Sequence, residues 1–215
     1  LTTLAEAFRE AAGEPECWEF QSAAPGAIEF CERQLEKQVA TLRAMRTARL
    51  EMEAEYDEAV HDDMLARFTW ESADAEELSA MPAVLVMDSA EVLAEQSLTT
   101  FGRLLRSGMP MQILLTCPRF YSGDLAFLAV SHHEAFVMQA SMACPEHLKE
   151  GLLDMTHTLR PAVAIVATED PALFHESQCF PLFVYDPDAG EDGIERVKLH
   201  RPASVPEGTT AVHVA

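Results

Sequence analysis

The fold of this chain is decided by the stretch AFVMQASMACPEHLKEGLLDMTHTLRPAVAIVAT, residues 135–168. Two short and almost wholly apolar runs, at 135–141 and 162–168, flank a segment that we predict to be a helix, 145–159. Strands that are apolar throughout are buried on both faces, which is typical of parallel sheets whose strands are joined by helices. We therefore predict a strand–helix–strand unit with a right-handed crossover.

The same alternation of strands and helices extends on both sides of this unit. After Glu169 the pattern weakens into a short helix at 171–177, an extended segment at 182–186 and a hairpin-like tail. We predict an α/β domain over residues 81–215, with an open, doubly wound, mostly parallel sheet and an irregular C-terminal tail. The other predicted elements are strands at 83–88 and 111–117 and helices at 90–106 and 124–132, the first of which Gly108 closes.

The N-terminal part, residues 1–80, differs in character and predicts a helical arm. Residues 27–68 contain no Gly or Pro, and their apolar residues recur in steps of mostly three or four. This spacing predicts one long amphipathic helix or two helices in a hairpin. A shorter helix is predicted at 3–12, and an acidic connection at 71–81. An apolar stripe of this length needs a partner surface, either the C-terminal domain or another subunit.

Composition limits the classes of partner. The chain has 215 residues, of which 48% are hydrophobic and 24% charged, and a formal net charge of −21. Such a field repels nucleic-acid phosphates and anionic lipid surfaces, so we expect neither partner. The sequence has no run of eighteen apolar residues and no signal peptide, which predicts a cytoplasmic protein without a membrane span. Because it begins at Leu1, it is also compatible with a piece of a longer polypeptide.

The cysteines are few and widely separated. Their odd number and the lack of any CxxC pair argue against a disulfide framework and against a local zinc or iron–sulfur motif. Any iron–sulfur cluster used by a larger complex is therefore expected on another polypeptide or domain. The five residues are Cys17, Cys31, Cys117, Cys144 and Cys179.

Three short motifs in the C-terminal half point to a known family. Ser107-Gly108 closes a predicted helix, Tyr121-Ser122 begins the loop after a predicted strand, and the segment FPLFVYDP occupies residues 180–187. By these motifs and their spacing the region resembles the thiamine-diphosphate-binding domain of pyruvate:ferredoxin (flavodoxin) oxidoreductases and related 2-oxoacid oxidoreductases. The family counterparts are an SG turn, a YSNTGG loop and a PLFxYDP segment.

The sequence departs from the family at both ends of the cofactor motif. The family's YSNTGG loop has an Asn that completes a magnesium site, and that position is Gly123 here. No Gly-Asp-Gly occurs upstream, where the chain has Met87-Asp88-Ser89, and by spacing the family's Asp falls nearer to Ala90. The resemblance therefore implies a domain or subunit of a 2-oxoacid:ferredoxin oxidoreductase-like system, structural or degenerate with respect to thiamine diphosphate. Catalysis would be oxidation of a 2-oxoacid, with electrons passed to ferredoxin or flavodoxin, and would need other domains or subunits.

Candidate site residues follow from the rule that ligands of such a sheet bind beyond the carboxyl ends of its strands. Asp88 offers a carboxylate and Asp124 a second oxygen for Mg²⁺ bridging a diphosphate. Ser89, Ser122 and Gly123 complete the predicted cofactor-binding set, since the backbone at a glycine can approach a phosphate closely. The competing interpretation is that Asp88 and Asp124 are a strand-end residue and a helix N-cap.

Other polar groups have simpler structural interpretations. His61-Asp62-Asp63 is expected on a solvated helix face, and His132-His133-Glu134 is expected to cap a helix. Cys117 is expected to be a small buried thiol. The turn 141–144 and residues 168–170 also lie at strand ends. A von Willebrand-type metal site in VLVMDSA lacks the later serines of DxSxS.

The alternative function needs no cofactor. In it, the chain is a non-catalytic interaction or scaffold module that uses the long amphipathic helix to dock onto another subunit or a second copy. The feature that separates the two functions is the loop 118–124 with Asp88. A pocket there that holds magnesium favours the oxidoreductase-like component, and side chains that fill the same space favour the scaffold.

Overall fold

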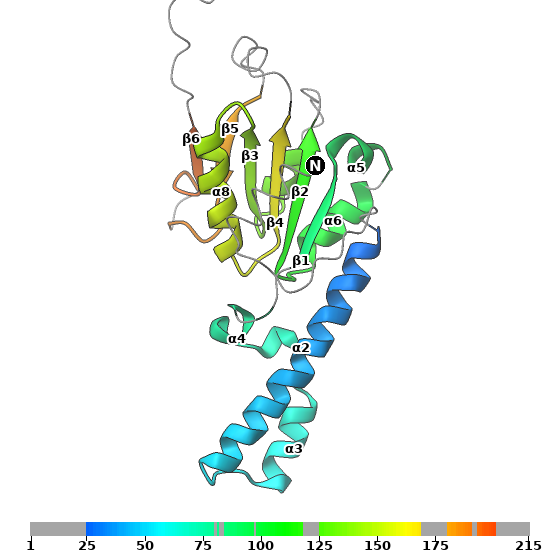
Figure 1. Cartoon of the computed structure of the whole chain (residues 1–215), viewed down its shortest axis with the longest axis vertical. Helices are drawn as coiled ribbons and strands as arrows, with labels where there is room; N and C mark the ends of the chain where they lie inside the picture. The colour runs from blue at the N-terminus through cyan, green and yellow to red at the C-terminus, as the bar shows by residue number, and fades with distance from the viewer. Residues whose placement is uncertain are drawn as a thin grey trace, which may run out of the picture.

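The computed structural model of the chain describes residues 25–79, 81, 84–96, 98–117, 125–168, 180–190 and 193–200. A six-stranded sheet lies at the centre, in the order β1-β2-β4-β3-β5-β6 (Figure 1). The strands are β1 (Val84–Ser89), β2 (Met111–Cys117), β3 (Phe136–Ser141), β4 (Ala162–Ala167), β5 (Leu182–Tyr185) and β6 (Val197–His200). The helices are α2 (Pro25–Met52), α3 (Glu58–Ala66), η1 (Trp70–Ser72), α4 (Ala75–Ser79), α5 (Ala90–Gln96), α6 (Leu98–Arg106), α7 (Leu125–Ser131) and α8 (Pro145–His157).

The sheet is mostly parallel. β1, β2, β4 and β3 run in one direction, and β5 and β6 form an antiparallel hairpin at the β3 edge. Every residue of β3 and β4 is buried, as expected for central strands covered on both faces. The predicted α/β class and mostly parallel sheet are thereby confirmed. The predicted extended segment at 182–186 contains β5, which pairs with β6 in a regular hairpin where the sequence predicts an irregular tail.

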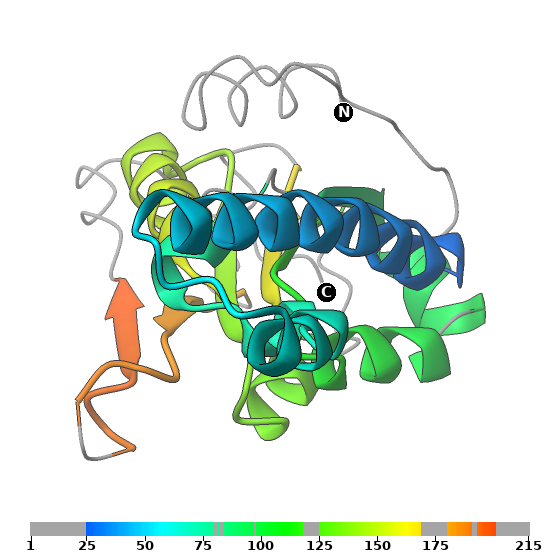
Figure 2. The ribbon, with the colours of Figure 1, turned by 90° about the horizontal axis from the view of Figure 1, so that it is seen from below.

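Helices cover the two faces of the sheet unequally. α5, α6, α7 and the first half of α2 pack on one face, in a core that includes Val86, Ile113 and Ile165. α8 packs on the other face, mainly on β3 and β4, in a second cluster around Met138. Figure 2, seen from below, shows α8 on the opposite side of the strands from α6 and α7.

α8 lies very close to β3 because one residue on its buried face has no side chain. A Cβ atom added at Gly151 would collide with Met138 Sδ and would lie 3.1 Å from Met138 Cγ. Met138 is fully buried in the second cluster, so it has little room to move away. The glycine therefore sets the distance between the helix and the sheet.

The N-terminal arm is a helical hairpin. α2 ends at Met52, and the chain turns back through Ala54, which has a φ of 57°, into α3 beside the outer half of α2 (Figure 1). Asp57 caps α3 by accepting a hydrogen bond from the Ala59 N–H (3.0 Å). Of the two predicted alternatives, the hairpin is confirmed. The first half of α2 belongs to the sheet's core, where Ile28, Cys31 and Leu35 are buried.

Two arginine residues of α2 bind the segment that follows α3. Arg46 makes a paired hydrogen bond to both carboxylate oxygens of Glu77 (2.7 Å each), and its guanidinium lies 4.2 Å from the centre of the Phe68 ring. Arg43 Nε donates to the Phe68 carbonyl (3.2 Å). Glu77 and Asp74 cap α4 reciprocally through each other's backbone N–H groups. The acidic connection is thus fixed to the arm by α2.

Some predicted elements differ in detail or lie outside the described residues. The predicted helix 90–106 is two helices, α5 and α6, and the predicted closure at Gly108 is confirmed by its φ of 68°. The predicted helices at 3–12 and 171–177 lie outside the described part of the chain. Within that part, no helix combines the length and hydropathy needed to cross a bilayer.

Candidate functional site

Asp88 lies at the carboxyl end of β1, where the sequence predicts a cofactor site. Its Oδ1 accepts a hydrogen bond from the N–H of Ser89 (2.8 Å). Its backbone carbonyl accepts one from Thr116 Oγ1 of the neighbouring strand (3.5 Å). The carboxylate therefore caps the junction between β1 and α5, which is the strand-end role that the competing interpretation gives it.

The junction after Asp88 leaves little space. α5 begins at Ala90, directly after Ser89, and both Ala90 and Leu93 are core residues with exposed fractions of 2% and 1%. Successive residues of a strand present their side chains to opposite faces, so Asp88 and Ser89 start from different faces of the sheet. A ligand bound at this edge would therefore contact Asp88 from one face of the sheet and Ser89 from the other.

The other half of the predicted site, Ser122, Gly123 and Asp124, lies outside the described residues. Across the residues that are described, no three or more His, Cys, Asp or Glu side chains are grouped so as to hold a metal ion. Asp88 is the carboxylate that the described residues contribute to the predicted magnesium site.

Hydrogen bonds that involve backbone groups stabilise the neighbouring strand ends. The Cys117 carbonyl at the end of β2 accepts a hydrogen bond from the Thr168 N–H (3.0 Å). Ser141 Oγ, at the end of β3, accepts one from the Ala143 N–H (3.1 Å) and so closes the turn before α8. The polar groups of Thr168 and Ser141 thus stabilise the ends of the strands.

The cysteines of known placement are buried. Cys117 has an exposed fraction of 1%, which confirms the prediction of a buried thiol. Burial, assisted by the charge of Glu32, raises the pKa of Cys31 to about 12. Burial also raises the pKa of Cys144. Thiolates are the reactive form of cysteine, so neither Cys31 nor Cys144 has the character of a nucleophile.

The two histidine groups named from the sequence cap helices. His61 Nδ1 lies 2.9 Å from the Asp57 N–H, at the start of α3. The backbone N–H of His132 donates to the Ala129 carbonyl and that of His133 to the Val130 carbonyl, at the end of α7. His133 has a φ of 60°, the left-handed conformation common after a helix. The backbone of this pair closes α7, while a capping role for its imidazole rings stays a prediction.

A second histidine pair, His147 and His200, is not found by the sequence analysis. His147 of α8 is buried, its Nε2 lies 3.2 Å from the Gln139 carbonyl, and its ring stacks on that of His200 of β6 at 4.5 Å. Burial lowers the pKa of His147 and His200 acts in the same direction, while the Gln139 carbonyl and Glu150 oppose them. The pair joins α8 to the edge strand.

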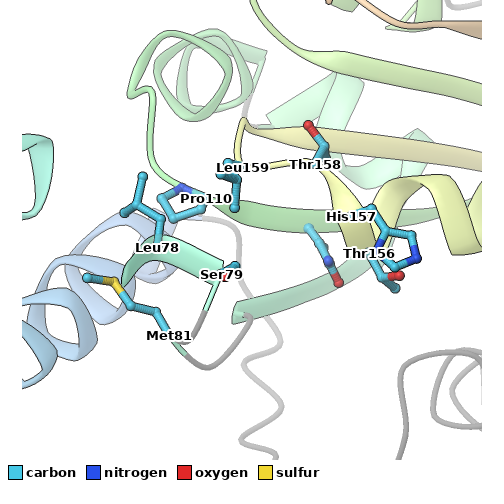
Figure 3. A pocket seen from close by; sticks show the side chains of 9 residues that line it. Leu78, Ser79, Met81, Pro110, Thr156, His157, Thr158 and Leu159 are labelled. Carbon is cyan, nitrogen blue, oxygen red and sulfur yellow. The ribbon is translucent and has the colours of Figure 1, made fainter. Parts of the chain in front are cut away.

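A cavity of about 180 Å³ lies at the other end of the sheet, where β2 begins and α8 ends (Figure 3). Its wall includes Gln112, whose side chain has an exposed fraction of 5%. The only sign of it in the sequence is this glutamine inside the apolar run MQILLTC. The nine lining residues come from α4 and its C-terminal side, from β2 and from the end of α8: Leu78, Ser79, Met81, Pro110, Gln112, Thr156, His157, Thr158 and Leu159.

The outer part of the hairpin carries exposed apolar side chains. Four of them, two on α2 and two on α3, have exposed fractions of 54% or more: Met45, Met52, Val60 and Met64. Met45 and Met52 are seven residues apart, so they lie on one face of α2. After Val39, no further side chain of α2 is buried.

Comparisons with known proteins do not identify a family. No protein-family model matches the chain, and a comparison with curated proteins finds no significant match.

Proposed function

We propose that the chain is a structural component of a 2-oxoacid:ferredoxin oxidoreductase-like assembly and does not itself use thiamine diphosphate. The observation that carries the proposal is the setting of Asp88. This carboxylate lies at the carboxyl end of a parallel strand, the edge where the resemblance implies a cofactor, yet it is engaged by the Ser89 N–H. The parallel order β1-β2-β4-β3 around it is compatible with a retained scaffold.

The surroundings of Asp88 favour a structural role over a diphosphate site. In the related family, glycines on both sides of the aspartate let the diphosphate approach the backbone. Here Ser89 follows Asp88, and the Cβ of Ala90 is packed into the core. A single carboxylate with no adjacent glycine is a poor donor set for Mg²⁺ and a diphosphate together, since that ion needs several oxygen ligands in near-octahedral geometry.

Calorimetric titration with thiamine diphosphate and Mg²⁺ tests the proposal. We expect no heat of binding at millimolar ligand, for the natural sequence and for Asp88→Ala alike. Micromolar binding that is abolished by Asp88→Ala would contradict it, and would call for assays with 2-oxoacids and ferredoxin.

The exposed apolar residues of the hairpin favour a second candidate, an interaction module. Met45 and Met52 on one face of α2 are suited to a helix–helix contact with another subunit or with a second copy. If the partner is a second copy, light scattering coupled to size-exclusion chromatography should give a molar mass of twice the 23.7 kDa of one chain. The Met45→Lys/Met52→Lys variant should give the mass of one chain. Ala40→Lys/Ala44→Lys, at exposed positions of α2 that lie off the face shared by Met45 and Met52, adds the same charge and serves as the control. A monomer at all concentrations would exclude self-association.

A further inference from the structure

We propose that His147 and His200 form a pH-sensitive contact, which holds the edge strand β6 against α8 near neutral pH and releases it when both rings are protonated. The contact lies at the β6 edge of the sheet and depends on neither function proposed above. Its release is a local opening of the domain that acid favours, distinct from unfolding of the whole chain.

Strand β6 is the least covered strand of the sheet. It has four residues, lies at the outer edge (Figure 1) and pairs with β5 on one side only, and all four residues are exposed. The ring of His200 joins it to α8 as well, by stacking on the ring of His147 with 4.5 Å between the ring centres. Short and exposed edge segments open more easily than the core of a fold, so this one contact contributes substantially to holding β6 in place.

His147 is placed so that a second proton is unfavourable while β6 is closed. Its exposed fraction is 6%, and its Nε2 lies 3.2 Å from the Gln139 carbonyl oxygen. Because only an N–H group can donate to that oxygen, the neutral ring carries its proton on Nε2, and acid adds the second proton at Nδ1. The resulting imidazolium would be a buried charge stacked on His200.

The ionisable groups that act on His147 lie on α8 and β6. His200 disfavours a charge on His147, and Glu150 of α8 favours one. Lys198 lies on the same face of β6 as His200, two residues away in an extended strand, and adds a positive charge there. Strand β3, which supplies the Gln139 carbonyl, has no ionisable side chain. Burial, the largest cause, together with His200 outweighs that carbonyl and Glu150 and lowers the pKa of His147.

Release of β6 takes His200 off the ring of His147 and opens that ring to water. The pKa of His147 then returns towards its ordinary value near 6.5. His200 is exposed, so its ring is hydrated in either protonation state. Two stacked like charges repel, so the closed pair accepts one proton and the open pair two. The closed state is therefore fully favoured above that value and loses its advantage as the pH falls, by roughly tenfold at most between pH 7.5 and 5.5.

Hydrogen exchange of backbone amides, followed by NMR, tests the release. In the natural protein, the protection factors of the β6 amides that bond to β5, corrected for the intrinsic exchange rate, should fall by roughly tenfold between pH 7.5 and 5.5. They should also stay well below those of the buried strand β2 at both pH values. Protection of β6 that does not change with pH would overturn the proposal. Protection equal to that of β2 would also overturn it, because β6 would then open only when the whole chain unfolds.

A pair of variants assigns the effect to His147. His147→Phe keeps an aromatic ring against His200 and removes the group that titrates, so the protection of β6 should no longer depend on pH. His157→Phe replaces an exposed histidine of the same helix and is the matched control, which should keep the natural change. Loss of the pH dependence in both variants, or in neither, would contradict the assignment. The comparison of β6 with β2 in the natural protein remains decisive if His147→Phe does not fold.

Discussion

The two ends of the sheet differ in how their polar groups are satisfied. At the carboxyl end, Asp88, Ser141 and Thr168 are hydrogen-bonded to nearby backbone groups. At the amino end, Gln112 has a buried oxygen without a partner, next to a cavity. Among the described residues, the polar groups at the carboxyl end are thus satisfied within the chain, whereas one buried polar atom at the amino end is not.

The largest effect is expected from disturbing the close contact of α8 with β3 at Gly151 and Met138. Gly151→Ala places a methyl group against Met138, so we expect a loss of roughly 1–3 kcal/mol in the free energy of unfolding, measured with urea. Gly102→Ala in α6 is the control, because its new Cβ would meet no atom nearer than 3.9 Å and alanine favours a helix. A Gly151→Ala protein as stable as Gly102→Ala would show that the helix does not lie so close.

A smaller effect is expected at the contact that holds α4 over the cavity. Arg46→Ala removes the paired hydrogen bonds to Glu77 and the contact with Phe68, and should lower the free energy of unfolding by about 1 kcal/mol, because the pair is partly exposed. The paired hydrogen bond raises the pKa of Arg46 and lowers that of Glu77. Arg49→Ala removes an exposed pair with Glu53 and should cause no measurable change. Equal losses in the two variants would argue against the Arg46–Glu77 contact.

At the carboxyl end, the stacked pair of buried His147 and exposed His200 predicts a dependence on pH. Burial lowers the pKa of His147 in the folded protein, so below the ordinary value near 6.5 the unfolded chain binds a proton that the folded protein does not. The contribution of His147 to stability is therefore complete above that value and is lost as the pH falls towards the lowered pKa.

His147→Phe should accordingly reduce the loss of stability between pH 7.5 and 5.5 in urea titrations. His200→Phe keeps a ring against His147 without its charge, and should raise the pKa of His147 in an NMR titration. An identical pH dependence in the natural protein and in His147→Phe would refute this account of the pair.

The smallest expected effect is at Cys31, which we expect not to be alkylated in the folded protein. Cys31 is fully buried, and its raised pKa leaves almost no thiolate near neutral pH, so iodoacetamide should not modify it in the folded protein. Peptide mass spectrometry after labelling at pH 8 should find Cys31 modified only when urea is present. Labelling within minutes under native conditions would mean that the first half of α2 does not stay packed on the sheet.

The sequence predicts the central strands well because their apolar runs admit few alternatives. The predicted strand 111–117 coincides with β2, and those at 135–141 and 162–168 differ from β3 and β4 by one residue. Residues that are apolar on both faces must be covered on both sides, which fixes a parallel sheet with helical crossovers.

The cavity and the histidine pair were not predictable, because each is formed by residues far apart in the chain. The cavity requires Ser79 of α4 to lie near Leu159 beyond α8, and no periodic pattern relates them. His147 meets His200 only because the β5–β6 hairpin adds two antiparallel strands beside β3. A glutamine inside an apolar strand and a histidine on a helix are each compatible with many surroundings.

The most direct test of the account is NMR mapping of thiamine diphosphate with Mg²⁺ on the folded protein. Asp88, Ser89 and Thr116 should stay unshifted at millimolar ligand, because Asp88 Oδ1 is already engaged by the Ser89 N–H. This outcome would support a carboxyl edge kept as scaffold. Saturable shifts around Asp88 that are lost in Asp88→Ala would contradict it.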